Sequence, residues 1–450
     1  MARPENRSAG RPPAAQSARV FHFADRRMDP ETGRVELVYR LDQLELTERL
    51  VLPGAPFSDL KQRDAAIEAA LDLVHWIAGV SYWKTACPQT IEFGQRSPDL
   101  WQARNLKQIY RQGLAEFAFE NALDIDRFPD FPSVLKTSQA PADFVLKRRS
   151  LVPMGGGKDS LVAWERLRGR GETPGSVQIG SSPLIHAIGR DLPGQHWLIE
   201  RKLDPGLAEL NRAGALNGHV PVTAINAAIL TLTAVLLDYD RVAFANERSA
   251  SQASRVDAEG REVNHQFSKS FEFEVLLDDW VRGYVHGSLR IFSLLRRDRE
   301  LAICRDFARL GQWHDKFSSC NRNFHLDGPR VERWCGQCPK CAFVYLCLAP
   351  FMRPADLARI FGQDLLNQAR LIERFAELLA LDGVKPFECV GESDEARAAI
   401  IELAGQSEWS GHVVVQALRE QLSSVAVPPL EALCGSGGPH RIPEDLLDAA

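Results

Sequence analysis

A short glycine-rich segment, Gly155–Ser160 (GGGKDS), constrains the fold of this 450-residue chain more than any other feature. The apolar run Ser150–Met154 precedes it and is typical of a buried strand, and helical spacing begins near Asp159. A glycine turn between a strand and a helix leaves bare backbone amides at the positive end of the helix, where they can hold an anion. The segment therefore predicts a phosphate site at the start of a βα unit.

This loop differs from the two commonest phosphate loops. A Walker A loop needs Ser or Thr directly after Gly-Lys, where this chain has Asp159, and the third glycine of a GxGxxG fingerprint would fall at Ser160. After the loop, short apolar runs alternate with helical segments, among them a buried helix expected over Val222–Leu237. This alternation predicts an α/β fold whose parallel sheet is covered on both faces.

The remaining segments have different patterns. Residues 19–52 alternate apolar and polar residues on both sides of a DPETG turn, which indicates an antiparallel hairpin, and helical spacing follows up to Asn121. We expect a disordered N-terminus (1–18), an α+β accessory domain (19–147), a phosphate-loop domain (148–315), a metal-binding region (316–350) and a helical region (351–450).

Composition restricts the partners of the chain. Its 54 Lys and Arg residues against 59 Asp and Glu residues give a formal net charge of -5, without the basic surplus that a nucleic-acid backbone requires. The most apolar run, 224–237, is shorter than the roughly 20 residues of a membrane span, and the Pro/Ala/Arg-rich start lacks the apolar core of a signal peptide. We expect a cytoplasmic protein that binds neither nucleic acid nor membrane. Its oligomeric state is left open.

Four of the nine cysteines are clustered in the sequence: Cys320, Cys335, Cys338 and Cys341. The last three form two C-x-x-C steps, and four converging thiolates are typical of a structural zinc site. An iron–sulfur cluster is the less favoured alternative for this spacing. The other cysteines are expected to pack as small apolar side chains: Cys87, Cys304, Cys347, Cys389 and Cys434.

The glycine segment resembles the SGGxDS signature of the PP-loop ATP pyrophosphatase superfamily, with Gly155 in place of the first serine. The resemblance implies that Gly155, Gly156, Gly157 and Ser160 bind the β- and γ-phosphates of ATP, with Lys158 neutralising charge and Asp159 near Mg²⁺. It also implies attack of a substrate oxygen on the α-phosphorus, which releases pyrophosphate and leaves an adenylylated intermediate. The loop and the cysteines together resemble those of the 7-cyano-7-deazaguanine synthases.

Three polar strings lie between the loop and the cysteines: Leu216–Asn226 (LNGHVPVTAIN), Ala245–Ser251 (ANERSAS) and Val263–Glu274 (VNHQFSKSFEFE). Each lies beside an expected helix or strand end, where the binding loops of a parallel sheet gather. In their order they are similar to the UDP-N-acetylmuramoyl-L-alanyl-L-glutamate epimerases of the MurL type, over about residues 20–380. The resemblance implies ATP-dependent epimerisation of the terminal L-glutamate of a UDP-N-acetylmuramoyl dipeptide, releasing AMP and pyrophosphate, in peptidoglycan precursor synthesis.

The polar strings also supply candidate site residues. His219, His265 and Lys269 can serve as general acids or bases, although a structural histidine or a phosphate-binding lysine explains each of them equally well. Asn246 and Glu247 are candidates for the nucleotide site, where Glu247 either binds Mg²⁺ or caps a helix. Cys320 is also a candidate racemase base, and Arg248, Arg322 and Lys269 are candidate partners of an anionic substrate.

Two other functions fit the same residues. One is a carboxylate-activating amide or nitrile synthase, or a thiolation enzyme, of the PP-loop type. The other is a non-catalytic sensor of ATP and zinc, which predicts ATP binding without release of AMP or pyrophosphate.

Overall fold

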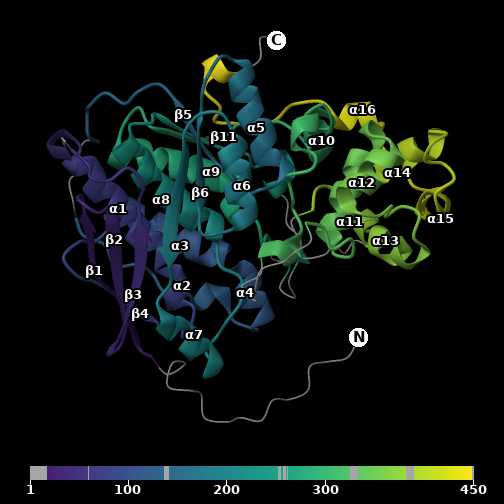
Figure 1. The fold of residues 1–450 in the computed structure, drawn as a ribbon. Coiled ribbons are helices and arrows are strands. Elements are labelled where there is room, and N and C mark those ends of the chain that lie inside the picture. The colour runs from purple at the N-terminus through teal and green to yellow at the C-terminus, as the bar shows by residue number, and fades with distance from the viewer. Residues whose placement is uncertain are drawn as a thin grey trace.

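The computed structural model describes residues 18–58, 60–135, 141–251, 255–256, 260, 262–324, 333–381 and 390–447. Within them a nine-stranded sheet forms the centre of the molecule, in the order β11-β8-β5-β6-β7-β3-β2-β1-β4 (Figure 1). Its strands are β1 (Val20–Asp29), β2 (Arg34–Leu41), β3 (Leu44–Val51), β4 (Thr90–Phe93), β5 (Ser150–Pro153), β6 (Gly175–Ile179), β7 (His196–Lys202), β8 (Arg241–Phe244) and β11 (Arg290–Ser293). A separate antiparallel pair is made by β9 (Arg255–Val256) and β10 (Glu262–Val263).

Five neighbouring strands, from β11 to β7, form the parallel sheet that the sequence predicts. Alternate residues of these strands enter two different cores, so that the sheet is covered on both faces. One core receives Leu151, Val242 and Ile291, together with the helix α8 (Val222–Leu237). The other receives Val152, Ala243 and Phe292, together with α5 (Lys158–Gly169) and α10 (Glu300–Ala308).

The N-terminal hairpin continues this sheet. Strands β1 and β2 pair in antiparallel fashion, as the sequence predicts, and Gly33 in their turn has a φ of 68° that a side chain would strain. Strand β3 then pairs with β7, with Arg49 opposite Lys202. One sheet therefore runs across the boundary that we expected near Lys147, and the division into two domains there stays a prediction.

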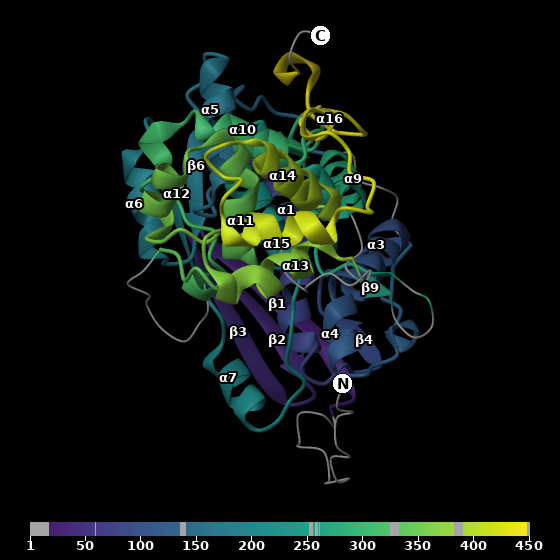
Figure 2. The same cartoon turned by 90° about the vertical axis from the view of Figure 1, so that its right-hand side faces the viewer.

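Helices cover the sheet and extend beyond it. The N-terminal half contributes α1 (Asp64–Ala78), α2 (Val80–Trp83), α3 (Leu100–Gly113) and α4 (Ala115–Glu120), and the parallel half adds α6 (Pro183–Asp191), α7 (Pro205–Arg212) and α9 (Phe271–Trp280). The C-terminal region is helical: α11 (Pro339–Leu348), α12 (Pro354–Phe361), α13 (Ile372–Leu379), α14 (Ser393–Gly405), α15 (Val413–Gln421) and α16 (Leu430–Leu433). These helices gather on the side of the molecule opposite β1–β3 (Figures 1 and 2).

Helix α8 has the bounds that its apolar run predicts, and it is buried along most of its length against α1 and the sheet. Because water is excluded on nearly all sides, no polar face is needed, which explains the absence of helical amphipathicity in its sequence. Among the described residues no helix has the length and apolar character of a membrane span.

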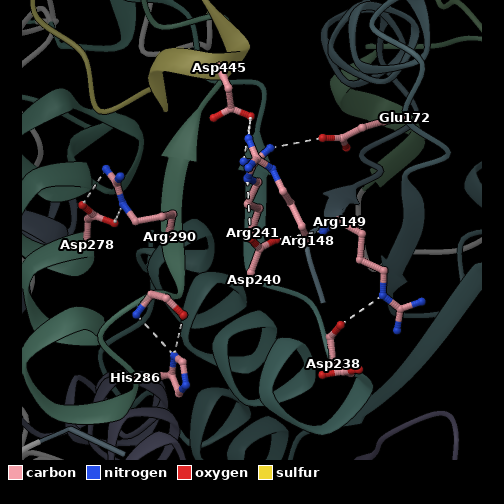
Figure 3. Close-up of polar contacts among 11 residues, drawn as sticks. Arg148, Arg149, Glu172, Asp238, Asp240, Arg241, Asp278, His286, Arg290 and Asp445 are labelled. Atoms are coloured by element: carbon pink, nitrogen blue, oxygen red, sulfur yellow. Dashed lines mark hydrogen bonds and ion pairs between the residues drawn. The ribbon is translucent and has the colours of Figure 1, made fainter. Parts of the chain in front are cut away.

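Ion pairs join the C-terminal segment to the amino ends of the parallel strands (Figure 3). Arg241, the first residue of β8, donates to Asp445 at 2.8 Å and to Glu172 at 3.2 Å, and Arg148 donates to Asp445 at 2.6 Å. At β11, Arg290 lies 3.2 Å from the buried carboxylate of Asp278. We call these contacts the amino-edge cluster.

Candidate functional site

The glycine loop lies at the opposite end of the strands, between β5 and α5. Gly156 has a φ of 79°, and Gly157 begins α5 without a side-chain cap. A Cβ on Gly157 would lie 2.8 Å from Ser319 Oγ, whereas one on Gly155 would meet no atom within 4 Å. The amides at the start of α5 are therefore free of a competing cap beside an open approach, an arrangement that fits an anion.

Lys158 is fixed within this loop by two carboxylates. Its side chain is 1% exposed, and its Nζ forms ion pairs with Asp159 and, at 2.8 Å, with Glu300 Oε1. Burial lowers the pKa of Lys158, but the two carboxylates outweigh burial and hold the pKa well above its ordinary value. Lys158 is thus a permanent cation whose ammonium is already paired, and Glu300 is a member of the site that the sequence analysis missed.

Three carboxylates, those of Asp159, Glu247 and Glu300, lie around Lys158, and Lys340 and Lys269 lie near them. Burial, and next the charge of Glu300, raise the pKa of Glu247 to about 7, and Ser249 donates its backbone amide to Glu247 Oε2 at 2.6 Å. Burial also favours the protonated form of Asp159, but the ammonium groups of Lys158 and Lys340 keep the pKa of Asp159 below its ordinary value. We call Lys158, Asp159, Glu247 and Glu300 the carboxyl-edge cluster. Its oxygen donors are of the kind that Mg²⁺ prefers.

The three predicted acid–base candidates come together beside this cluster. The rings of His219 and His265 have centroids 6.5 Å apart, and His219 Nδ1 lies 3.5 Å from Glu116 Oε2. Burial, aided by the charges of His265 and Lys269, lowers the pKa of His219 to about 4, so that its ring is neutral at pH 7. The charge of Lys269 also lowers the pKa of Asp159, so Lys269 is near enough to act on both the loop and His219.

Arg296, which the sequence analysis also missed, connects two of the polar strings. Its side chain is 2% exposed and donates to the backbone oxygens of Glu247 at 2.9 Å and of Lys269 at 2.7 Å. A third bond, at 3.0 Å, reaches Glu274. Arg296 lies just beyond the carboxyl end of β11. Binding residues of parallel sheets gather at such positions, and this was the signal by which the sequence could have identified Arg296.

Two other predicted residues lie at the margins of the site. Asn246 follows β8 and lines a small cavity that Ser268 also lines. Arg322 lies in a short 3-10 helix, Asn321–Phe324, on the cysteine side of the loop.

The four clustered cysteines converge as the sequence predicts. The Sγ atoms of Cys320, Cys335, Cys338 and Cys341 all lie within 4.8 Å of one another. The Sγ–Sγ distance is 3.7 Å between Cys335 and Cys341 and 3.4 Å between Cys338 and Cys341. Zinc bound at about 2.3 Å by each sulfur places tetrahedral sulfurs about 3.8 Å apart, so that the set fits a zinc ion. Cys320 is one of the four, and Cys389 lies outside the described residues.

The cysteine cluster is joined to the glycine loop through Ser318. Its amide donates to the carbonyl oxygen of Gly156 at 2.9 Å, and its Oγ accepts the amide of Cys320 at 3.2 Å. The same Oγ donates to the carbonyl oxygen of Arg333 at 2.6 Å. Ser318 therefore connects the cysteine cluster to the backbone of the glycine loop.

Comparisons with known proteins place the chain in one family. The family model of the MurL N-terminal domain matches residues 13–294, and that of the MurL C-terminal domain matches residues 316–432. A UDP-N-acetyl-α-D-muramoyl-L-alanyl-L-glutamate epimerase of Xanthomonas oryzae pv. oryzae is 44% identical over 95% of this chain and 96% of its own. Proteins of the same name from Salinispora tropica and a Micromonospora species are 40% and 38% identical, over 96% and 94% of this chain and 95% and 96% of theirs. The chain belongs to the MurL family.

Proposed function

We propose that this chain inverts the α-carbon of the terminal L-glutamate in UDP-N-acetyl-α-D-muramoyl-L-alanyl-L-glutamate. The observation that carries the proposal is the identity of 38–44% to three epimerases named for this substrate, over 94% or more of the chain. The grouping of the glycine loop, carboxylates and histidines at one edge of the sheet supports a catalytic site there.

ATP is the activating co-substrate in this proposal. The α-proton of a glutamate residue is only weakly acidic, because its loss places negative charge beside a carboxylate. An acyl adenylate removes that carboxylate charge and stabilises the enolate, and its formation releases pyrophosphate. The uncapped amides at the start of α5 would receive a phosphate group, and Asp159 and Glu247 would hold Mg²⁺, which neutralises phosphate charge when bound. Hydrolysis after inversion would give the D-glutamate product and AMP.

Inversion requires one group to remove the α-proton and another to return a proton on the opposite face. His219 and Lys269 are the pair that we assign, because burial, with the charges of His265 and Lys269 beside it, keeps His219 neutral at pH 7, and an amine can serve as its acid–base partner. His265, whose ring centroid lies 6.5 Å from that of His219, is a further candidate for the proton transfer. Arg296 holds the backbone of Lys269 in position.

The cysteine cluster has a supporting part in the proposed function. Its four thiolates would hold Zn²⁺, whose contribution is structural, because a closed set of four sulfurs leaves no open position for substrate. Through Ser318 the cluster would keep the carbonyl of Gly156 turned away from the phosphate.

The experiment that tests the function is incubation of the purified chain with the UDP-muramoyl dipeptide, ATP and Mg²⁺ in deuterated water. D-glutamate that carries α-deuterium, formed with AMP and only when ATP is present, is the expected result. D-glutamate formed without ATP would overturn the adenylate route and keep the epimerase. AMP without inversion would indicate a different carboxylate substrate, as in an amide or nitrile synthase.

A further inference from the structure

A large cleft lies beside the carboxyl-edge cluster and has no part in the mechanism above. Its volume is about 1610 Å³, more than the roughly 300–1,000 Å³ that a drug-sized ligand occupies. One wall is formed by α3 and α4, and another by residues that follow β8 and β11. A cleft of this size suits an extended ligand with several chemical groups.

Several cations line the cleft, and two of them have no side-chain partner among the described residues. Lys107 and Arg111 line it but form ion pairs with Asp130 and Asp126. Arg104 on α3 and Arg248 after β8 line it as well, are exposed, and have no side-chain partner within the described part of the chain. Two unpaired guanidinium groups on different walls of one cleft fit a ligand that carries phosphate, because a guanidinium binds phosphate oxygens through two parallel hydrogen bonds.

An aromatic ring lies on the wall that carries Arg104. Phe119 of α4 lines the cleft and is 40% exposed, so that part of its side chain reaches solvent. A partly exposed aromatic ring beside cations fits the flat face of a nucleobase.

The cleft reaches the candidate active site through its own wall. Arg296 lines the cleft and donates to the backbone of Glu247 and Lys269. Arg248 follows Glu247 directly in the chain, so that two adjacent residues belong to the cleft and to the carboxyl-edge cluster. A ligand that fills the cleft would therefore end beside the carboxyl-edge cluster.

We propose that this cleft binds the nucleoside diphosphate end of the substrate, with the diphosphate between Arg104 and Arg248 and the base on Phe119. This assignment rests on the proposed function, because it presumes a nucleotide-linked substrate. It places the glutamate end of the same molecule at Glu247 and Lys269.

Titration of the full-length chain with uridine 5′-diphosphate, followed by calorimetry in the absence of ATP, tests the assignment. We expect one site per chain in the unchanged protein. The double substitution Arg104→Ala and Arg248→Ala should weaken binding about a hundredfold, about tenfold for each charge-assisted contact. Phe119→Leu keeps the apolar volume but removes the ring face, and should weaken binding about tenfold.

Arg212→Ala is the matched control, because Arg212 is an exposed arginine in the last turn of α7 that does not line the cleft. Its affinity for uridine 5′-diphosphate should stay within about twofold of that of the unchanged protein. Equal affinity in the double variant, or no binding by the unchanged protein, would overturn the assignment. Retained affinity in the double variant would indicate that the diphosphate binds at the glycine loop instead.

The deuterium experiment separates failure of this assignment from failure of the proposed function. A chain that epimerises the dipeptide with the same KM in the double variant lacks the cleft subsite but keeps the activity. A chain that binds uridine 5′-diphosphate through Arg104 and Arg248 but never inverts glutamate has the subsite and lacks the proposed activity.

Discussion

The two ends of the parallel sheet both carry charged residues, but they balance charge differently. At the amino-edge cluster Asp445 lies between Arg148 and Arg241, and these arginines hold its pKa below the ordinary value although burial opposes them (Figure 3). At the carboxyl-edge cluster, Lys158 is shared by two carboxylates, and burial and Glu300 raise the pKa of the nearby Glu247 to about 7.

This difference separates a structural from a functional use of charge. Paired charges at the amino edge stabilise the folded chain by joining its C-terminal segment to the strands. At the carboxyl edge, burial and the neighbouring Glu300 make ionisation of Glu247 costly, and a carboxyl group with such a shifted pKa is common at functional sites. Substitutions at the two edges should therefore have opposite consequences for activity and stability.

The largest expected effect is the loss of turnover in Asp159→Asn. The substitution removes the carboxylate next to Lys158 and should lower the rate of AMP and D-glutamate formation about a thousandfold or more, as loss of a single group that stabilises transition-state charge does elsewhere. The melting temperature should change by only a few degrees. A rate equal to that of the unchanged protein would remove the glycine loop from the mechanism.

The second largest expected effect is on stability, and it comes from removal of one thiol of the cysteine cluster. We expect about one zinc per purified chain, and Cys338→Ser should lose it and destabilise the chain by about 4 kcal/mol, because metal binding free energy is also folding free energy. Elemental analysis and thermal unfolding measure the two results. Iron with sulfide, or a chain that contains no metal, would contradict the zinc assignment.

Removal of a buried carboxylate of the amino-edge cluster should have the reverse effect of Asp159→Asn: it should lower stability and leave turnover unchanged. Asp278 is 0% exposed, lies 3.2 Å from Arg290 and accepts the amide of Ile291 at 3.0 Å, so that Asp278→Ala should destabilise the chain by about 3 kcal/mol. Its kcat at a temperature where the variant is folded should be unchanged. Asp279→Ala, at the neighbouring and more exposed carboxylate, is the control and should cost less than about 1 kcal/mol. Equal losses in the two variants would contradict the importance of burial.

Local patterns in the sequence were sufficient to predict separate elements of this fold. The period of two predicts the hairpin of β1 and β2, and the apolar run predicts α8. The pairing of β3 with β7 could not be predicted, because the choice of a partner strand about 150 residues away leaves no periodic signal in either strand. One sheet therefore spans both segments that the patterns separate, and the division into two domains stays a prediction.

The candidate site was predictable where residue type and spacing were unusual. The glycine loop, the cysteines and the two histidines have such patterns, and the structure brings each set together. Glu300 and Arg296 were missed because both lie in a run of alternating charges before a helix, which is an ordinary way to begin one. Only their position after β11 distinguishes them, and that position depends on the order of strands in the sheet.

The pH dependence of stability tests the carboxyl edge without substrate. The pKa of Glu247 is raised from 4.5 to about 7, so the folded chain holds a proton that the unfolded chain releases at lower pH. Stability from this group is therefore present at low pH and lost as the pH rises from about 4.5 to 7. Glu247→Gln imitates the protonated group and, without Mg²⁺, should stabilise the chain at pH 8 by about 1–2 kcal/mol, with little difference at pH 5. A Gln variant that is destabilised at pH 8 would show that ionisation of Glu247 does not cost stability.

The smallest expected effect comes from the exposed part of the amino-edge cluster. Arg148 is 68% exposed in its ion pair with Asp445, and Asp445 keeps a second partner in Arg241 when Arg148 is removed. Arg148→Ala should therefore destabilise the chain only slightly, and this loss should shrink further in 1 M salt, because an exposed pair is screened by water and ions. Thermal unfolding at low and high salt measures both results. A loss as large as that of Asp278→Ala would mean that the cluster acts as one network, in which Arg148 orients Asp445 toward Arg241, and that pairing rather than burial sets the strength of this edge.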